Sequence, residues 1–374
     1  MLVLGWMDNL RAPFFPDVVQ SLSLSATEGS LFYSISSLFA FSASQFGSLW
    51  LRRFSSRQIL EGALVGFAFG YFLMSRSSGL FSMVAFVAVF GIFFGLLNYS
   101  QNVLVHEFAP AKYKRRLFNG LHSMYGVAAV IAPLSATMFI TSGLNWRQSF
   151  LALCPLPLIL AAASLIFLPK SEPPSADAAM SMSAVGISKR ALWIAGLPVA
   201  LYMFGEITVG SRLVYLLRTV DNYSAETANL YLTIFYTGLL TGRLCFTVFD
   251  FSHISSRKVL VSCASTSVIL LVLGQTVHPF WMALSGLSMA PYYPVSMNHI
   301  SESFPRYAPR ALAFAIGLCS LTTVTLHFIL GILTDLYGLK NALWIAPGGL
   351  LLVLTMLQVE MRLSKTGAVP KISN

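Results

Sequence analysis

Long apolar segments fill most of this chain, and they restrict it to very few kinds of fold. We count twelve such segments, each close to twenty residues long and without the alternating pattern of a β-strand. Only 10 % of the residues are charged, whereas a soluble chain carries about 25 %. Too few polar side chains are present to cover a surface that faces water. The sequence therefore predicts an all-α membrane protein with twelve transmembrane helices.

The twelve predicted helices fall into two groups of six. The first group covers residues 1–20, 29–50, 59–75, 80–105, 117–141 and 149–168. The second group covers residues 191–216, 228–249, 259–277, 280–300, 311–334 and 342–359. A polar stretch rich in Pro and Ser separates the groups and predicts a flexible linker at 169–190. We therefore predict an N-terminal six-helix bundle (1–168), the linker, and a C-terminal six-helix bundle with a short tail (191–374).

A short basic turn occurs twice and indicates that the two bundles arose by duplication. Phe-Ser-Ser-Arg-Gln-Ile-Leu at 54–60 returns as Ile-Ser-Ser-Arg-Lys-Val-Leu at 254–260, which makes Arg57 equivalent to Arg257. Each copy follows one apolar segment and opens the next. A second repeat, at a spacing of 196 residues, relates Asn102 to Asn298 and Phe108 to Phe304. The sequence therefore predicts two pseudo-symmetric halves.

The positive charge of the chain follows its topology. The net charge is +10, but the Lys and Arg residues form short clusters between apolar segments, so we do not expect nucleic acid as a partner. The even-numbered loops and the tail hold seventeen of them and the odd-numbered loops hold four. This bias predicts a bacterial-type inner (plasma) membrane protein whose linker and C-terminus are cytoplasmic. The four cysteines lie within apolar segments, so we expect neither a disulfide nor a metal site. Apolar sequence begins at Met1, and we expect the natural start to lie upstream.

Six plus six helices, a central linker and basic turns after the second and eighth spans resemble the major facilitator superfamily. Arg53, Arg57 and Leu60 match the turn motif of that family, while Arg52 stands where the family has an acid. The resemblance implies alternating access around a midplane site built from helices one, four, five, seven, ten and eleven. It also implies that the turns at Arg57 and Arg257 contact the opposite half and stabilise the outward-open state.

Further stretches are similar to the branch that contains the fucose–proton symporters and related sugar carriers. They are Gly205-Glu206, the run Gly238–Arg243, the run Asn98–Asn102 and the run Arg116–Gly126. In that branch, an acid on the first helix and a Glu on the fourth helix handle the proton. Asp8 matches the first acid, but Asn98 stands in place of the Glu and cannot titrate. The resemblance therefore implies the fold and leaves sugar specificity and proton coupling open.

Charged side chains inside the first span mark a candidate site, because each buried charge costs about 2.5–3.5 kcal/mol on membrane-insertion scales. Asp8 and Arg11 are three residues apart and share one helix face. Pro13 lacks the backbone N–H that would bond the Asn9 carbonyl, which loosens the helix at this point. In the functional interpretation, Arg11 holds an anionic or polar group, Asp8 exchanges a proton, and Asn9 is a further substrate or coupling residue. The alternative is an internal ion pair.

Two further pairs of polar residues lie on the fourth and fifth spans. Asn98 and Asn102 share a face, and their amides suit a hydroxyl-rich or amide-bearing ligand, although amides also tie helices together. His122 and Tyr125 share a face of the fifth span. His122 is a candidate for a group that titrates near neutral pH, and its alternative role is packing.

Glu206, in the middle of the seventh span, is the strongest single candidate. It would act as a proton carrier or substrate ligand, and its alternative role is to tie the seventh helix to a neighbour. Arg212 lies six residues further on and faces elsewhere on the helix; it is a further substrate or coupling candidate, and in the alternative its side chain reaches toward the outer surface. Arg243, near the cytoplasmic end of the eighth span, is predicted to be a structural or gating cation that pairs with an acid or with carbonyls.

The predicted function is secondary active transport of a small polar or charged solute, with the lipid bilayer and the solute as partners. The phosphate-binding pattern of ATP-driven proteins does not occur in the sequence, so we expect no cofactor and an ion gradient, most plausibly of protons, as the energy source. The sequence contains no catalytic constellation that would indicate an enzyme. Efflux of an amphipathic compound or metallophore and a non-transporting, receptor-like role are the alternatives. We expect a monomer.

Overall fold

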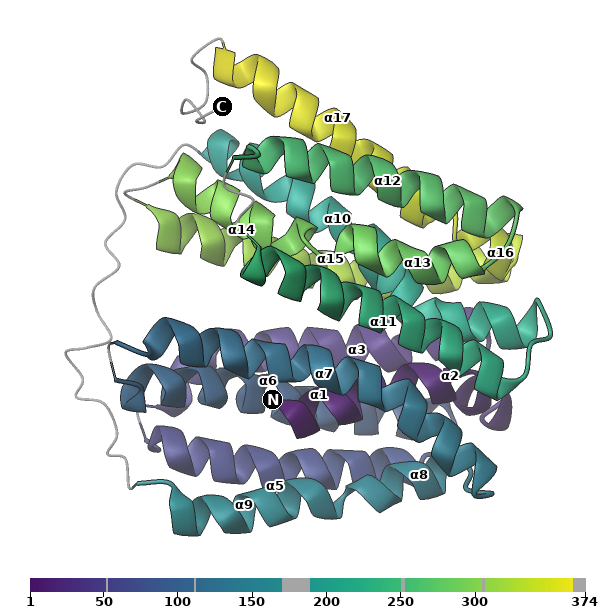
Figure 1. Cartoon of the computed structure of the whole chain (residues 1–374). Helices are drawn as coiled ribbons and strands as arrows, with labels where there is room; N and C mark the ends of the chain where they lie inside the picture. The colour runs from purple at the N-terminus through teal and green to yellow at the C-terminus, as the bar shows by residue number, and fades with distance from the viewer. Residues whose placement is uncertain (52, 111, 170–188, 250–252, 305–306, 366–374) are drawn as a thin grey trace. The chain divides into compact units, whose positions relative to one another are not determined.

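The computed structural model describes residues 1–51, 53–110, 112–169, 189–249, 253–304 and 307–365, which form seventeen helices and no strand (Figure 1). The all-α prediction is confirmed. The chain divides into two compact units, Met1–Ala184 and Val185–Asn374. Each unit is an antiparallel bundle of helices and is described by itself. Most of the predicted linker, residues 170–188, lies outside the described residues.

The first unit builds six spans, three of which consist of two consecutive helices. Its helices are α1 (Leu2–Asn9), α2 (Arg11–Ser21), α3 (Ala26–Gln45), α4 (Gly47–Trp50), α5 (Ser56–Ser75), α6 (Leu80–Phe108), α7 (Lys114–Thr141), α8 (Trp146–Leu153) and α9 (Pro155–Phe167). The paired helices are α1 with α2, α3 with α4, and α8 with α9. We call the end of each unit that leads to the linker its linker end.

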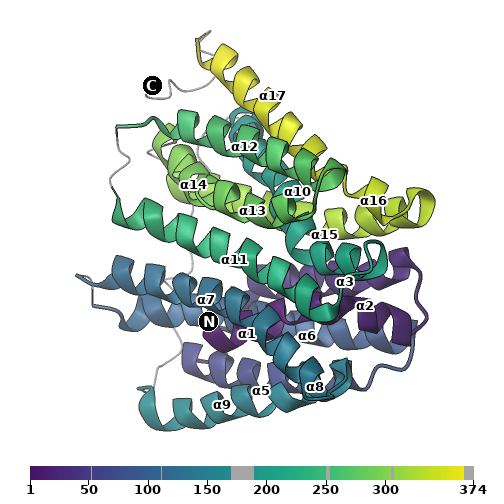
Figure 2. The ribbon, with the colours of Figure 1, turned by 45° about the vertical axis from the view of Figure 1, so that its right-hand side comes forward.

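The second unit repeats this plan. Its helices are α10 (Lys189–Thr219), α11 (Ala225–Val248), α12 (Ser256–Thr276), α13 (Phe280–Met289), α14 (Tyr292–Ser303), α15 (Ala308–Tyr337), α16 (Leu339–Ala342) and α17 (Ile345–Lys365). The pairs α13 with α14 and α16 with α17 each form one span. Figure 2 shows the same helices in a view turned by 45°.

Eight segments among the described residues are long and apolar enough to cross a membrane by length and composition alone. They are α5, α6, most of α7, α8 with α9, α10, α12, α15, and α16 with α17. The other four spans are α1–α2, α3–α4, α11 and α13–α14. Three of these four carry the helix breaks or the charged side chains described below, and this explains why they stand out less by hydropathy.

Prolines set two of the helix breaks. The first span is interrupted at Leu10, between Asn9 and Arg11, as the missing N–H of Pro13 predicts. The tenth span is interrupted at Ala290 and Pro291, where α13 ends and α14 begins. Pro294, one turn into α14, leaves the carbonyl of Ala290 without its usual helical donor. Both interruptions lie beside charged side chains.

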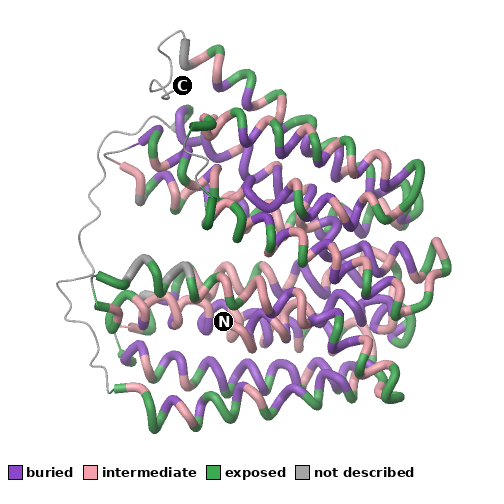
Figure 3. The backbone as a smooth tube through the Cα atoms, in the orientation of Figure 1, coloured by how far each residue is buried: buried purple, intermediate pink, exposed green. Residues whose placement is uncertain are grey.

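Glycines bring neighbouring helices into backbone contact in both units. A Cβ atom at Gly95 of α6 would lie 2.2 Å from the Ala40 carbonyl oxygen of α3. A Cβ atom at Gly286 of α13 would lie 2.1 Å from the Phe235 carbonyl oxygen of α11. Since these distances exclude any side chain, glycine fixes the second span against the fourth and the eighth against the tenth. Figure 3 shows the buried residues that gather between the helices of each unit.

Candidate functional site

The candidate residues of the first span form a three-membered cluster in the N-terminal unit. Asp8 Oδ1 is ion-paired with Nη2 of Arg11, so the predicted shared face is confirmed. Asp8 Oδ2 accepts a hydrogen bond from the Tyr125 hydroxyl of α7. The side chains of Arg11 and Asp8 are 8 % and 16 % exposed. The carboxylate is therefore held from two directions.

The Arg11 guanidinium is enclosed by the second and fourth spans. Its Nη1 donates to Ser36 Oγ at 2.8 Å, and its Nε lies 3.2 Å from the Asp8 carbonyl oxygen. Its central carbon lies 5.6, 5.2 and 4.8 Å from the ring centroids of Phe32, Tyr33 and Phe90. Three aromatic faces, one carboxylate and a hydroxyl thus compensate the buried charge. This is the internal ion pair that was the alternative interpretation of Arg11.

The other polar residues of this unit are engaged more locally. The Asn9 amide donates to the Gly5 carbonyl oxygen at 2.8 Å, within its own helix. The Asn102 amide donates to Oδ1 and to the carbonyl oxygen of Asn98 at 3.0 and 2.8 Å, so these two side chains share a face as predicted. His122 is exposed, one turn from Tyr125 on α7. Of the pair on the fifth span, Tyr125 is thus the one that bonds the acid.

Glu206 is the centre of a second cluster, in the C-terminal unit. Nη2 of Arg243, on α11, lies 3.0 Å from Glu206 Oε1 and 3.3 Å from Oε2. Nε of Arg243 also donates to the Ala290 carbonyl oxygen at 3.4 Å, the acceptor that Pro294 leaves free. Arg243 therefore pairs with both an acid and a carbonyl, the two types of partner predicted for it. The side chains of Arg243 and Glu206 are 39 % and 21 % exposed.

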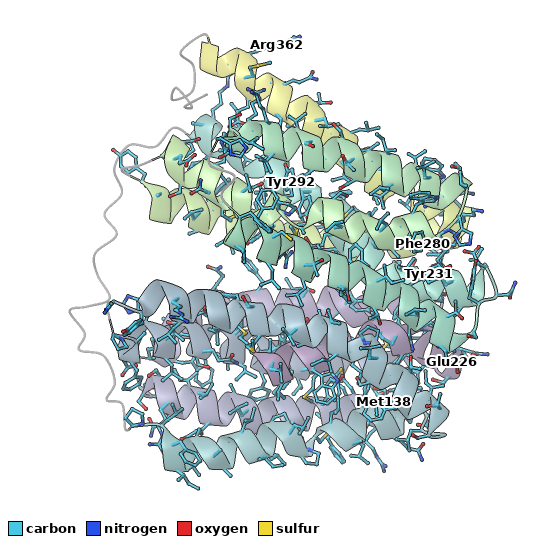
Figure 4. All side chains as sticks on the ribbon, viewed as in Figure 1. Met138, Glu226, Tyr231, Phe280, Tyr292 and Arg362 are labelled. Atoms are coloured by element: carbon cyan, nitrogen blue, oxygen red, sulfur yellow. The ribbon has the colours of Figure 1, made fainter. Side chains whose placement is uncertain are left out.

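The hydroxyl of Tyr202 lies between two acceptors. It is 2.6 Å from Glu206 Oε2 and 2.9 Å from the Met289 carbonyl oxygen, and it has one proton to donate. The Tyr202 ring is stacked on Tyr292, with centroids 4.3 Å apart and an angle of 12° between the planes. Tyr292 is labelled inside the C-terminal unit in Figure 4. If Glu206 takes up a proton, the acid can donate to the Tyr202 hydroxyl, which then donates to Met289. Both protonation states of Glu206 can thus be hydrogen-bonded.

The two clusters contain the same types of residue, but these residues come from different spans. Asp8 and Glu206 lie on the first span of their units and are 198 residues apart, close to the spacing of the other repeats. Each acid is bonded by one Arg and one Tyr. Arg11 comes from the same span as its acid, whereas Arg243 comes from the next one. Glu206 and Arg243 are 37 positions apart in the sequence, so their contact cannot be inferred from spacing along one helix.

The structure buries Arg212, which differs from the alternative in which its side chain reaches the outer surface. Its side chain is buried and only 2 % exposed. The physical reason is the length of α10, which continues to Thr219, whereas we predicted the span to end at 216. Arg212 therefore lies two turns inside the helix end and within the bundle.

The basic turns bind the last span of their own unit. Arg57 donates to the carbonyl oxygens of Leu168 and Leu165 at 2.6 and 2.9 Å, next to the end of α9. Arg257 Nη2 donates to the Leu357 carbonyl oxygen of α17. The duplicated arginines thus occupy equivalent positions in the two units. The contacts to the opposite half that the family resemblance implied stay a prediction. Arg53 is exposed.

Arg57 is also tied to an acid of its own helix. Its Nε lies 2.7 Å from Glu61 Oε1, and the hydroxyl of Ser164, on α9, donates to the same oxygen atom at 3.4 Å. The guanidinium therefore closes a small network that joins the start of α5 to the end of α9. Such a cation next to the last carbonyls of a helix is electrostatically favourable.

One buried ionisable pair was missed by the sequence analysis. His299 Nε2, on α14, lies 3.2 Å from Glu360 Oε1, on α17, and the side chains are 6 % and 5 % exposed. The predicted twelfth span ended at 359, which left Glu360 outside the membrane, but α17 continues to Lys365. A signal existed in the sequence: Leu350, Val353 and Leu357 are buried, and Glu360 continues their helical spacing.

Metal-ligating side chains do not cluster in the part of the chain that the structure describes. Within it, no three His, Cys, Asp or Glu side chains are placed to hold a metal ion. The chemistry available to the two clusters is therefore that of carboxylates, guanidinium groups and phenol hydroxyls: they can bind a polar solute and exchange protons.

Residues 1–244 match the Major Facilitator Superfamily, and this is more than half of the 374-residue chain. The chain therefore belongs to the Major Facilitator Superfamily. It is an integral, multi-pass membrane protein with the fold of secondary transporters. Proteins of this family bind small molecules within the membrane and are in general not enzymes. No curated protein sequence matches the chain.

Solved transporter structures share the fold over almost the whole chain. A bacterial homologue of the human lysosomal transporter Spinster is 12 % identical, with 96 % of this chain and 94 % of that chain covered and a TM-score of 0.78. A mutant of the nucleoside transporter NupG is 12 % identical, with coverages of 96 % and 98 % and a TM-score of 0.77. A D-xylose–proton symporter is 17 % identical, with coverages of 95 % and 94 % and a TM-score of 0.74. At these identities the likeness shows the fold alone.

Proposed function

We propose that the protein is a proton-coupled secondary transporter of a small polar or charged solute that works by alternating access. We place it in a bacterial-type inner membrane as a monomer, with its linker and C-terminus in the cytoplasm. The observation that carries the proposal is the position of Glu206, which is held midway along α10 between a guanidinium group and a phenol hydroxyl.

The coupling that we propose is an exchange of partners at Arg243. While Glu206 is ionised, the two side chains neutralise each other. When Glu206 takes up a proton, Arg243 keeps its charge and loses its counter-ion. A cation that has lost its carboxylate partner is costly in a membrane interior, so an anionic or hydrogen-bond-accepting group of the solute would replace the carboxylate. Binding of the proton and binding of the solute therefore favour each other.

Three considerations support a polar solute. Charged side chains within membrane-spanning helices, such as Glu206 and Arg243, are expensive, and a purely hydrophobic cargo would not need them. One protein of the same fold is by name a D-xylose–proton symporter, although its identity to this chain is only 17 %. The similarity of the runs at Gly205-Glu206 and Gly238–Arg243 to the fucose–proton symporter branch points the same way.

The first experiment is a thermal-shift screen of purified protein against sugars, organic anions, nucleosides, metallophores and amphipathic drugs at two pH values. A ligand at a hundredfold excess over its Kd stabilises the native state by about 2.7 kcal/mol. Any hit is then tested for uptake into proteoliposomes with and without a pH gradient. We expect a polar hit whose uptake follows the pH gradient.

Three variants test which acid carries the coupling proton. We expect Glu206→Gln to abolish gradient-driven uptake and to leave exchange of the solute without a gradient measurable. Asp8→Asn tests the first span in the same way. Glu226→Gln is the matched control, because Glu226 is an exposed acid at the start of α11 in the same unit (Figure 4). Gradient-driven uptake that survives Glu206→Gln would refute the proposal. Binding without uptake would favour the receptor-like role, and uptake only of amphipathic compounds would favour efflux.

A further inference from the structure

A second buried pair of ionisable groups lies in the C-terminal unit, away from Glu206. His299 is one turn from the end of α14, and Glu360 is five residues from the end of α17. The two side chains meet at 3.2 Å and join the tenth span to the twelfth near the linker end of the unit. The transport cycle proposed above makes no use of either residue.

The surroundings of the pair contain few other charges. On α14, the buried side chains Tyr292, Ser296 and Ser303 share a face with His299, and Ser303 donates to the His299 carbonyl oxygen at 2.8 Å. The other charged or titratable side chains on the packed helices toward the linker end include Arg190 on α10, Arg257, Lys258 and Cys263 on α12, Arg310 and Cys319 on α15, Glu302 on α14 and Arg362 on α17. Arg190, Lys258 and Arg310 are exposed.

None of these charged groups takes the place of a partner in the pair. The Arg257 guanidinium donates to the Leu357 carbonyl oxygen. Glu302 is exposed and accepts a hydrogen bond from Asn298 at 2.7 Å. Arg362 is exposed near the end of α17 (Figure 4). His299 and Glu360 therefore depend on each other for charge compensation.

The proton count of such a pair determines its net charge. With one dissociable proton between them, His299 and Glu360 form either an ion pair or a neutral hydrogen-bonded pair, and both forms have no net charge. With no proton, a carboxylate is left uncompensated; with two protons, an imidazolium is left uncompensated. Because either charge is costly where water is excluded, one proton is retained as long as the pair stays buried. Release of that proton requires that water reach the pair.

The N-terminal unit shows that the fold does not require this pair. The repeat that relates Asn102 to Asn298 relates Val103 to His299. The last span of that unit, α8 with α9, contains no Asp or Glu. The same spacing relates Ser164 to Glu360, so the N-terminal unit has no ionisable side chain at either position. Replacing a buried ionic pair by residues without charge is often neutral or stabilising. Packing alone therefore gives no reason for His299 and Glu360.

We propose that His299 and Glu360 form a second proton-binding site, distinct from Glu206, which holds one proton and latches α14 to α17 at the linker end. Loss of the proton leaves a buried carboxylate charge that only hydration can relieve, so it drives the ends of the two helices apart. The latch makes the C-terminal unit sensitive to the pH on the linker side. It does not depend on whether Glu206 carries the coupling proton.

The test is a double-mutant cycle on the full-length protein in lipid nanodiscs. The melting temperature is measured for wild type, His299→Gln, Glu360→Gln and the double variant at several values between about pH 5 and 8, the range in which histidine changes charge. We expect the single effects to be non-additive by several degrees and this non-additivity to change across the pH range. A non-additivity that is the same at every pH would show a fixed hydrogen bond and would overturn the proposal, as would simple additivity.

A matched cycle uses His327 and Glu302, another His and Glu of the same unit. His327 is buried on α15 and Glu302 is exposed on α14. We expect His327→Gln and Glu302→Gln to be additive at every pH. Repeating the His299 and Glu360 cycle in the Glu206→Gln protein separates this proposal from the proposed function, because the pH-dependent coupling should persist there.

A spectroscopic measurement covers the case in which a variant does not fold. Infrared difference spectra of the wild type between two pH values should contain the carboxyl change of Glu360, identified by its shift in the conservative variant Glu360→Asp. Identical spectra for wild type and Glu360→Asp in a folded protein would refute proton binding at this pair.

Discussion

The hydroxyl of Tyr202 offers the sharpest test of the site at Glu206, because it can be removed without changing the shape of the side chain. Tyr202→Phe deletes one oxygen atom that lies 2.6 Å from Glu206 Oε2 and 2.9 Å from the Met289 carbonyl oxygen. The ring and its stacking on Tyr292 are kept. The ion pair with Arg243 is also kept. The variant therefore isolates one hydrogen bond to the carboxyl group.

The expected magnitude follows from the two protonation states of Glu206. A hydrogen bond to an ionised group contributes about 1.5–3 kcal/mol, and one between neutral groups about 0.5–1.5 kcal/mol. The hydroxyl therefore favours the ionised form by about 1–1.5 kcal/mol, which corresponds to about one pH unit. Because the hydroxyl stabilises the ionised state, its removal shifts the pH midpoint of solute uptake upward. We expect a shift of about one unit with little change in the maximal rate.

The control is Tyr292→Phe. Tyr292 is as deeply buried as Tyr202 and stacks on it, but its hydroxyl lies 3.4 Å from the Pro198 carbonyl oxygen and does not bond Glu206. If the loss of any buried hydroxyl were enough to cause the effect, Tyr202→Phe and Tyr292→Phe would change alike, chiefly in melting temperature. A shift in the pH midpoint should occur only in Tyr202→Phe.

Uptake into proteoliposomes is measured as a function of internal and external pH for the three proteins. An unchanged midpoint in Tyr202→Phe would refute the reasoning, because it would mean that the hydroxyl donates to Met289 in both states of the cycle. Equal shifts in both variants would refute it as well, since the effect would then not require contact with Glu206.

Two further predictions concern stability. Arg57→Ala removes hydrogen bonds to two carbonyl oxygens and one carboxylate, so we expect a loss of about 1–3 kcal/mol in the free energy of unfolding, whereas Arg53→Ala, at an exposed position, should have no measurable effect. Gly286→Ala would place a Cβ atom 2.1 Å from a carbonyl oxygen and should cost about 1–3 kcal/mol or abolish folding, while Gly317→Ala, with open space around it, should be neutral or stabilising. Denaturation of the purified proteins in detergent measures both comparisons.

What the sequence predicts well is what depends on neighbouring residues. The spans follow from apolar runs, and the contact between Asp8 and Arg11 follows from a spacing of three on one helix. The interruption of the first span at Leu10 follows from the missing N–H of Pro13. The contact of Asn98 with Asn102 is likewise local. Each of these depends only on the geometry of a single helix.

Contacts between helices could not be predicted in this way. Glu206 and Arg243 are 37 residues apart, and His299 and Glu360 are 61 residues apart. Their partners are set by which helix faces meet and by where each helix ends. An error of a few residues at the end of the twelfth span was enough to place Glu360 outside the membrane. The same kind of error placed Arg212 near a surface that its side chain does not reach.

The contrast between the two acid clusters bears on which of them can change during transport. Arg11 is packed against three aromatic rings and a serine, and its side chain is 8 % exposed. Release of Asp8 would leave this cation where no other group could reach it. Arg243 is 39 % exposed, and besides Glu206 it contacts the Ala290 carbonyl oxygen at 3.4 Å.

Glu206 can therefore give up its ion pair at a lower cost than Asp8, because Arg243 is open to a replacement ligand and Arg11 is not. The cluster of the first span has the features of a fixed support, which holds the broken helix α1–α2 against α3 and α7. The cluster of the seventh span has the features of an exchange site. A duplicated fold has thus placed an acid at equivalent positions in both halves and surrounded each acid with an Arg and a Tyr from different spans. The packing around the arginine decides which copy is free to act.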